Sequence, residues 1–239
     1  MNIGNKLKGI IILALLFGML SPFASPLKAQ AASVQQGVVD ITSGKLIVRS
    51  SPNAKASTIG SLSKSQKVAV LSQKNGWAQI QYGSKKGYVS LQYLRFYLST
   101  SSSSVKKITD RVISIQRDTW DRTLSKQQIY SILAPAYTKA YIDGYFKVHM
   151  RTDGKRNGVQ MYHINETDIF GYAISTFDWA KQYDPMPTHS YYKKNNSEYL
   201  IVSQYKNDEM DGNHTLTLSL IKEPKSSWKV YGINRVYDK

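Results

Sequence analysis

The dipeptide Asn75-Gly76 stands between two short segments in which apolar and polar residues alternate. A two-residue hairpin loop needs a positive φ at its central residues, which Asn and Gly tolerate best, so this pair predicts a tight β-hairpin. Similar short segments, each ended by Gly, Pro, Ser or Asn, fill residues 37–96. Strands so short and so closely spaced predict a small all-β barrel. We expect Gly83 and Gly87 to bracket a further turn in it.

The composition changes after this block. The run of Thr and Ser at residues 99–104 has no apolar anchor and predicts a linker. A stripe of apolar residues with a period near 3.6 then predicts a helix over 105–123. Ser125 and Gln128 form a capping-box pattern that starts a second helix, which we expect to end near residues 143–144. Pro135 predicts a kink or a break within it.

Strand patterns dominate the remainder of the chain. We expect strands at residues 145–151, 158–164, 199–205, 213–221 and 228–236. The clearest alternation is Thr-Leu-Thr-Leu-Ser-Leu at 215–220, with Leu facing a core and hydroxyls facing out. Residues 167–181 are ambiguous, because Gly171 weakens a helix. Helices followed by a curved antiparallel sheet predict an α+β domain over 105–239, after a barrel domain at 37–98.

The N-terminus resembles an export signal. Lys6 and Lys8 precede an apolar run of 12 residues, and the small-residue site Ala29-Gln30-Ala31 follows. This order predicts a signal peptide at residues 1–31 that is cleaved. A membrane anchor is the alternative, but the run is shorter than the roughly 20 residues that span a bilayer. We therefore expect a secreted, extracellular protein without a membrane anchor after cleavage.

The chain is strongly basic, with 32 Lys and Arg residues against 16 Asp and Glu residues. Residues 33–98 hold nine of these basic residues and a single acid, Asp40. Such a charge attracts polyanions. Outside the cell we expect anionic wall polymers or lipid headgroups as partners and no nucleic acid. The alternative is that the charge only keeps the protein soluble.

Catalytic and metal-binding patterns are sparse. The sequence has no Cys, which excludes a disulfide framework and a thiol nucleophile, and its four His residues show no ligand spacing typical of zinc. We expect no metal and no cofactor. Glu166 is the best candidate for the general acid of a sugar-cleaving site, although such residues more often cap helices. The many Tyr residues fit strands without any ligand.

Three segments, at residues 46–52, 59–68 and 75–93, resemble the successive motifs of bacterial SH3 (SH3b) domains. The resemblance covers residues 37–96. It departs from the family at Ile47, at Ser51 and Ser65 where Gly is usual, and at Gln79. The resemblance implies a partly open small barrel in a wall-associated protein, and such modules commonly bind peptidoglycan peptides or cross-bridges. The segment order after residue 105, with its ending at 228–236, resembles the cystatin-type cone of nuclear transport factor 2-like domains, which more often bind or scaffold than catalyse.

Together these features favour a secreted envelope protein of the Gram-positive type, and a binding protein rather than an enzyme. The SH3b domain would hold it on peptidoglycan or anionic polymers, and the second domain would bind a ligand or a partner protein. Two alternatives stay open: a peptidoglycan hydrolase with Glu166 as acid, and a modulator or inhibitor that binds a wall hydrolase. We expect the ligand-binding residues to be Arg49, Trp77, Tyr82, Lys85, Lys86, Tyr88 and Tyr93, although some of them, Trp77 first, could belong to the core.

Overall fold

The computed structural model describes residues 34–164, 171–209 and 212–239. The predicted signal peptide lies outside these ranges, as does Glu166. The buried apolar residues form two separate clusters, one in residues 39–96 and one in residues 105–230. We call residues 35–98 the barrel and residues 99–239 the C-terminal region.

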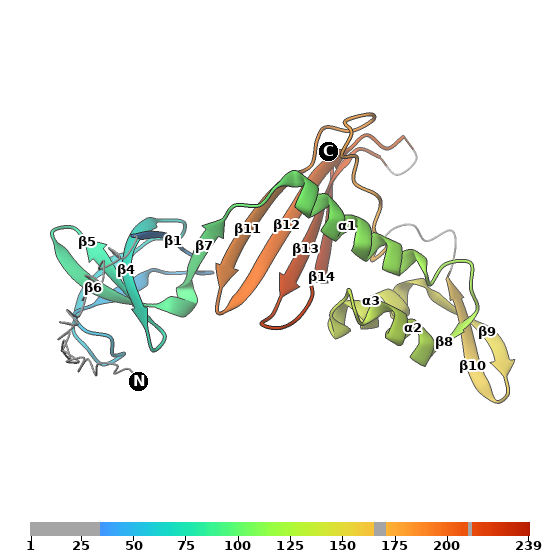
Figure 1. Cartoon of the computed structure of the whole chain (residues 1–239), viewed down its shortest axis with the longest axis horizontal. Helices are drawn as coiled ribbons and strands as arrows, with labels where there is room; N and C mark the ends of the chain where they lie inside the picture. Colours follow the sequence, from blue (N-terminus) through green and yellow to red (C-terminus); the bar gives the residue numbers. More distant parts are fainter. Residues whose placement is uncertain (1–33, 165–170, 210–211) are drawn as a thin grey trace, which may run out of the picture. The chain divides into compact units, whose positions relative to one another are not determined.

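The barrel consists of short antiparallel strands, as the sequence predicts (Figure 1). Its elements are β1 (Gln35–Val39), β2 (Leu46–Arg49), β3 (Thr58–Leu62), β4 (Lys67–Lys74), β5 (Trp77–Tyr82), β6 (Lys85–Ser90), the 3₁₀ turn η1 (Leu91–Tyr93) and β7 (Leu94–Leu98). Alternate residues of these strands, including Val48, Ile80 and Val89, are fully buried. The inward residues supply the core because side chains alternate between the two faces of a strand.

The turns of the barrel follow the prediction at two points and contradict it at a third. Asn75 and Gly76 have φ values of 49° and 77° and join β4 to β5 as a tight hairpin. Gly83, with φ 60°, lies in the turn before β6. Gly87 is not a turn residue, because it lies buried within β6 opposite Ile80. A Cβ at this position would overlap the side chain of Val48, so glycine is needed here for close packing.

The helices differ from the prediction at their ends. The first helix begins at Ser102 and ends at Arg117 instead of spanning 105–123, and the last helix continues to His149 instead of ending near residues 143–144. Helix α1 (Ser102–Arg117) takes in half of the predicted linker, because the side chain of Ser101 caps it by accepting a hydrogen bond from the Ser104 amide. The capping box of Ser125 and Gln128 starts α2 (Lys126–Leu133), as expected. Pro135 breaks the chain there, and α3 (Lys139–His149) follows as a separate helix. The strand predicted from residue 145 is therefore wrong over its first five residues.

A small sheet follows the helices. It pairs β8 (Leu124–Ser125), β10 (Val159–Ile164) and β9 (Met150–Arg156) in that order. Its hairpin loop consists of Asn157 and Gly158, with φ values of 48° and 76°. These two residues repeat the loop chemistry of Asn75-Gly76, whereas the sequence interpretation placed the whole turn at 152–157.

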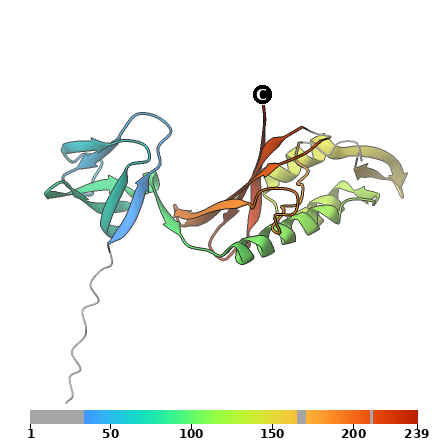
Figure 2. The same ribbon diagram turned by 90° about the horizontal axis from the view of Figure 1, so that it is seen from above.

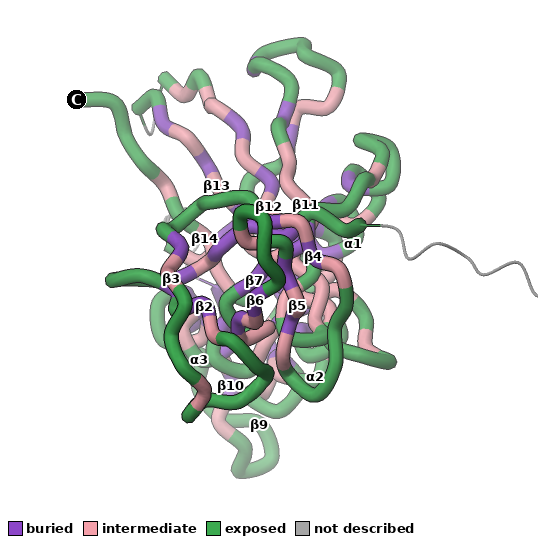
Figure 3. Tube along the Cα trace, turned by 90° about the vertical axis from the view of Figure 1, so that its left-hand side faces the viewer, coloured by how far each residue is buried: buried purple, intermediate pink, exposed green. Residues whose placement is uncertain are grey.

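The main sheet of the C-terminal region contains β11 (Thr188–Lys194), β12 (Ser197–Lys206), β13 (His214–Lys222) and β14 (Lys229–Tyr237). The last three strands were predicted, and β11 was not. Along β13 the Leu residues at 216, 218 and 220 are buried while the intervening hydroxyl residues are half-exposed, which confirms the alternation (Figure 3). Helix α1 lies along one face of this sheet (Figures 1 and 2), and the inward Leu residues share a core with all three helices.

Strand β7 joins the two sheets, because it pairs with β1 through Val38–Arg95 and with β11 through Tyr97–Tyr192. The ladder is continuous over 11 strands, in the order β14-β13-β12-β11-β7-β1-β4-β5-β6-β2-β3. The fold is thus an SH3-like barrel followed by a mostly-β curled sheet with three helices in the described residues. The predicted order of helices before sheet is present, but helix is a smaller part of the C-terminal region than the α+β prediction implied. None of the helices in the described ranges combines the length and apolar character needed to cross a membrane.

Candidate ligand-binding hollows of the barrel

A hollow of about 500 Å³ opens on the barrel between the loop after β1, strand β2 and η1. We call it the Trp77 hollow. Its lining combines apolar, hydroxyl and basic side chains and includes no acid. The lining residues are Ile41, Thr42, Ser43, Lys45, Leu46, Ile47, Arg49, Ala54, Trp77, Ser90, Gln92 and Tyr93. Such a mixture, with aromatic walls and a few polar groups, is typical of ligand-binding clefts.

Trp77 also borders a second hollow of about 430 Å³, which we call the Tyr88 hollow. The amide of Gln79 donates a hydrogen bond to the Tyr88 hydroxyl at 2.7 Å and so fixes the ring at its edge. Trp77 is half-buried at the start of β5, opposite Ser90 of β6. An aromatic side chain that borders two hollows presents a large rigid surface at low entropic cost. Trp77 is therefore the centre of the candidate site rather than part of the core.

Arg49 supplies a fixed positive charge to the Trp77 hollow. Its guanidinium donates a hydrogen bond to the carbonyl oxygen of Ala56 at 2.8 Å, which ties the β2–β3 loop to β2. Lys45 is exposed at the rim and carries a second positive charge. The two cations are suited to an anionic group of a ligand.

The structure brings four of the seven predicted ligand residues to the two hollows: Arg49, Trp77, Tyr88 and Tyr93. Tyr82 does not line them, because its ring covers Gly60 and packs against the barrel core. Lys85 and Lys86 are exposed on β6 and line neither hollow. A role for these three residues in ligand binding therefore stays a prediction, and the exposed Lys85 and Lys86 remain open to a polyanion outside the two hollows.

Several lining residues were not anticipated from the sequence, and Lys45, Ile47 and Gln92 are the main ones. Ile47 is 38 % exposed although it belongs to a strand, and its apolar side chain lines the hollow. The only signal that could have found it is its departure from the polar residue usual in the family. Loop and 3₁₀ residues such as Lys45 and Gln92 carry no pattern of their own.

The single acid of the barrel is already neutralised. Asp40 accepts a hydrogen bond from Lys194 at 2.6 Å and lies 3.7 Å from Arg95. Partial burial opposes ionisation, but the Lys194 hydrogen bond and the two cations hold the pKa of Asp40 below its ordinary value. The remaining basic charge of the barrel therefore has no acidic counterpart within residues 33–98.

The candidate acid Glu166 lies outside the described residues, and its predicted role stays a prediction. Within the ranges that the structure covers, no group of three His, Cys, Asp or Glu residues is arranged to hold a metal ion.

Residues 44–95 match the family model of the bacterial SH3 domain. The chain therefore carries an SH3b domain, which belongs to a family of cell-wall-binding modules. The matched residues include the lining of the Trp77 hollow except Ile41, Thr42 and Ser43. No curated protein matches the chain. The resemblance of the C-terminal region to the nuclear transport factor 2-like cone remains a prediction.

Proposed function

We propose that this chain is an exported cell-envelope protein of a Gram-positive bacterium, in which the SH3b domain attaches the protein to the wall. The barrel binds peptidoglycan that carries anionic polymers, and the C-terminal region binds a ligand or a partner protein. Export rests on the signal pattern at residues 1–31. The attached protein is a binding protein rather than an enzyme.

One observation carries the proposal: the Trp77 hollow combines an exposed aromatic edge with two cations and no acid. A neutral ligand could accept hydrogen bonds from Lys45 and Arg49, but an anionic wall polymer would form stronger, charge-assisted bonds with both. Nine of its twelve lining residues also lie within the matched family segment, which supports a ligand from the cell wall. Net positive charge would raise the association rate with such a surface.

The test is cosedimentation of the purified chain 33–239 with bacterial walls. Binding should weaken between 0.15 M and 1 M salt, because the screening length falls from about 8 Å to about 3 Å. Walls stripped of their anionic polymers should bind more weakly at low salt. Trp77→Leu should lose at least tenfold in affinity, equivalent to about 1.4 kcal/mol, since buried aromatics dominate binding surfaces.

Lys45→Gln and Lys67→Gln provide a matched pair. Both remove one exposed positive charge from the barrel, but only Lys45 lines the Trp77 hollow. A larger loss of wall binding in Lys45→Gln supports a site in this hollow. Equal losses in the two variants, together with normal binding by Trp77→Leu, would show unspecific attraction and refute the proposal.

A further inference from the structure

A separate pocket of about 330 Å³ lies in the C-terminal region, at the end of the sheet where β13 turns into β14. We call it the Tyr231 pocket. Its lining residues are Thr138, Tyr199, Ile221, Glu223, Ser226, Lys229 and Tyr231. The volume is at the lower end of the range for ligand sites, which suits roughly two or three small residues of a peptide.

Two Tyr side chains form rigid apolar walls of this pocket. The rings of Tyr199 and Tyr231 meet edge to face, with centroids 6.2 Å apart and planes at 89°. Behind them Tyr192 stacks on Tyr199 at 5.1 Å with the planes 9° apart. These contacts hold the Tyr199 ring in one orientation before any ligand arrives. Together with Ile221 the rings offer a preformed surface for small aliphatic groups.

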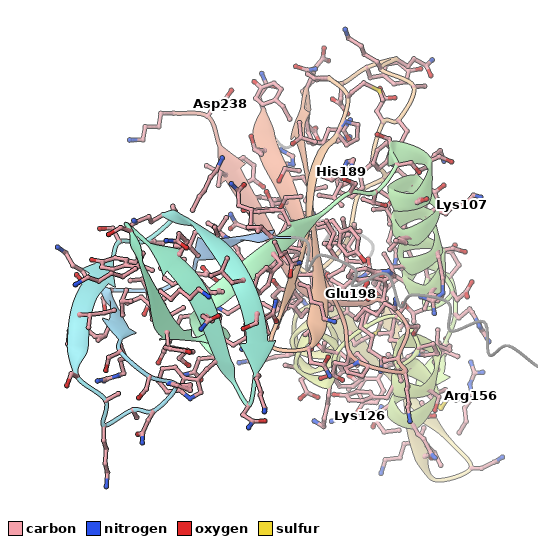
Figure 4. All side chains as sticks on the ribbon, turned by 60° about the vertical axis from the view of Figure 1, so that its left-hand side comes forward. Lys107, Lys126, Arg156, His189, Glu198 and Asp238 are labelled. Carbon is pink, nitrogen blue, oxygen red and sulfur yellow. The ribbon has the colours of Figure 1, made fainter. Side chains whose placement is uncertain are left out.

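The pocket also carries one charge of each sign. Neither Glu223 nor Lys229 forms an ion pair with another residue in the described ranges. By contrast Glu198, labelled in Figure 4, accepts a hydrogen bond from Tyr191 at 2.5 Å and pairs with Lys222 at 3.4 Å. The acid and base of the Tyr231 pocket are thus available to charged groups of a ligand.

The start of helix α3 adds to the positive side of the pocket. Thr138 lines the pocket and is the N-cap of α3, where its hydroxyl accepts from the Tyr141 amide. Its own amide donates to the carbonyl of Val230 at 2.9 Å, which fixes the helix end beside β14. A helix N-terminus carries a partial positive charge that favours anions. This charge and Lys229 together favour a carboxylate.

We infer that the Tyr231 pocket binds a short peptide with a free amino group, a free carboxylate and small aliphatic side chains. The carboxylate pairs with Lys229 near the start of α3, the ammonium pairs with Glu223, and the aliphatic groups contact Tyr199 and Tyr231. A neutral glycan fits less well, because its hydroxyl groups could hydrogen-bond to Glu223 and Lys229 but would supply neither with an opposite charge.

The test is calorimetric titration of the chain 33–239 with tri-alanine, in its all-L and all-D forms, and with the same peptides N-acetylated or C-amidated. We expect the uncapped peptide to bind and each cap to weaken it about tenfold. Glu223→Gln should remove the penalty of acetylation and leave that of amidation, and Lys229→Gln should do the reverse. Lys225→Gln, which removes a cation from the same turn outside the pocket lining, should bind like the parent.

A preference for the all-D peptide assigns the ligand to wall-derived peptides, and a preference for the all-L peptide assigns it to peptides released from proteins. Equal binding of capped and uncapped peptides, no binding of either, or stronger binding of a neutral oligosaccharide would overturn the inference. Wall cosedimentation of Glu223→Gln and Lys229→Gln should stay normal, because the Trp77 hollow is untouched. The two proposals can therefore fail independently.

Discussion

Replacement of Gly87 by Ala tests whether this glycine is required by close packing rather than by a turn. Gly87 is buried in β6, and its added methyl group would overlap the Cγ1 atom of Val48. Val48 is 0 % exposed and its short branched side chain is stiff, so it cannot move aside. We therefore expect Gly87→Ala to destabilise the barrel.

The size of the effect follows from the packing. Insertion of a methyl group into a well-packed core typically costs about 1–3 kcal/mol, and the immobile neighbour places this site near about 2 kcal/mol. For a barrel of this size that unfolds as a unit, the change corresponds to a fall of roughly 10 °C in Tm. Val48→Ala alone should cost about 2 kcal/mol through the cavity that it leaves.

Equilibrium unfolding in urea measures the effect through the fluorescence of Trp77, the single Trp of the barrel, in a parent chain in which Trp120, Trp179 and Trp228 are replaced by Phe. The double variant Gly87→Ala with Val48→Ala should be more stable than the sum of the single changes predicts, by at least about 1 kcal/mol. Gly83→Ala is the control for a true turn glycine, since its φ of 60° costs about 1 kcal/mol whatever the space around it. A cost below about 0.5 kcal/mol for Gly87→Ala, or additive single changes, would refute the packing argument.

Three further predictions concern the C-terminal region. Hydrogen bonds from backbone amides, first that of Tyr183, hold the pKa of Asp178 at about 2, below its unfolded value of 3.8. The hydrogen bonds to this carboxylate should therefore persist above pH 3.8 and be lost as the pH falls toward 2. The NMR chemical shift of the Tyr183 amide measures this loss. Lys206→Met should cost about 3 kcal/mol in thermal unfolding, because it leaves the buried carboxylate of Asp184 unpaired; a cost under 1 kcal/mol would contradict this. Incubation with peptidoglycan should release no soluble muropeptides, and release that Glu166→Gln abolishes would establish the hydrolase alternative.

The sequence specifies the barrel well because its local signals agree with one another. Strands β2 and β5 lie within the short segments that the sequence analysis assigned to the barrel, and turn residues bound each of them. The error at Gly87 arose because glycine serves both turns and close contacts, and only the position of Val48 distinguishes the two. Strand β11 was missed because its residues are mostly half-exposed Ser, Tyr and Lys, which show no apolar alternation. It is a strand because it pairs with β12 and β7.

The candidate site was predictable only in part, for a similar reason. Trp77 and Tyr93 stand out as aromatics in a recognisable motif, and both line the hollow. Lys45 lies in a loop, and loops bring residues together in ways that no periodic pattern records. Tyr82 and Tyr88 are both aromatic residues of the same motif, so the sequence does not distinguish their roles. Only the structure shows that the Tyr82 ring lies over Gly60 and covers the core.

Strand β7 pairs with both β1 and β11, and these two partners are synthesised at very different times. All strands of the barrel have emerged by residue 98, yet β11, which covers the second edge of β7, starts only at Thr188. In the interval the open edge of β7 presents unpaired backbone groups, which can recruit foreign strands. A chain cut short within the C-terminal region would keep that edge exposed, so truncated products should aggregate even though their barrel is complete.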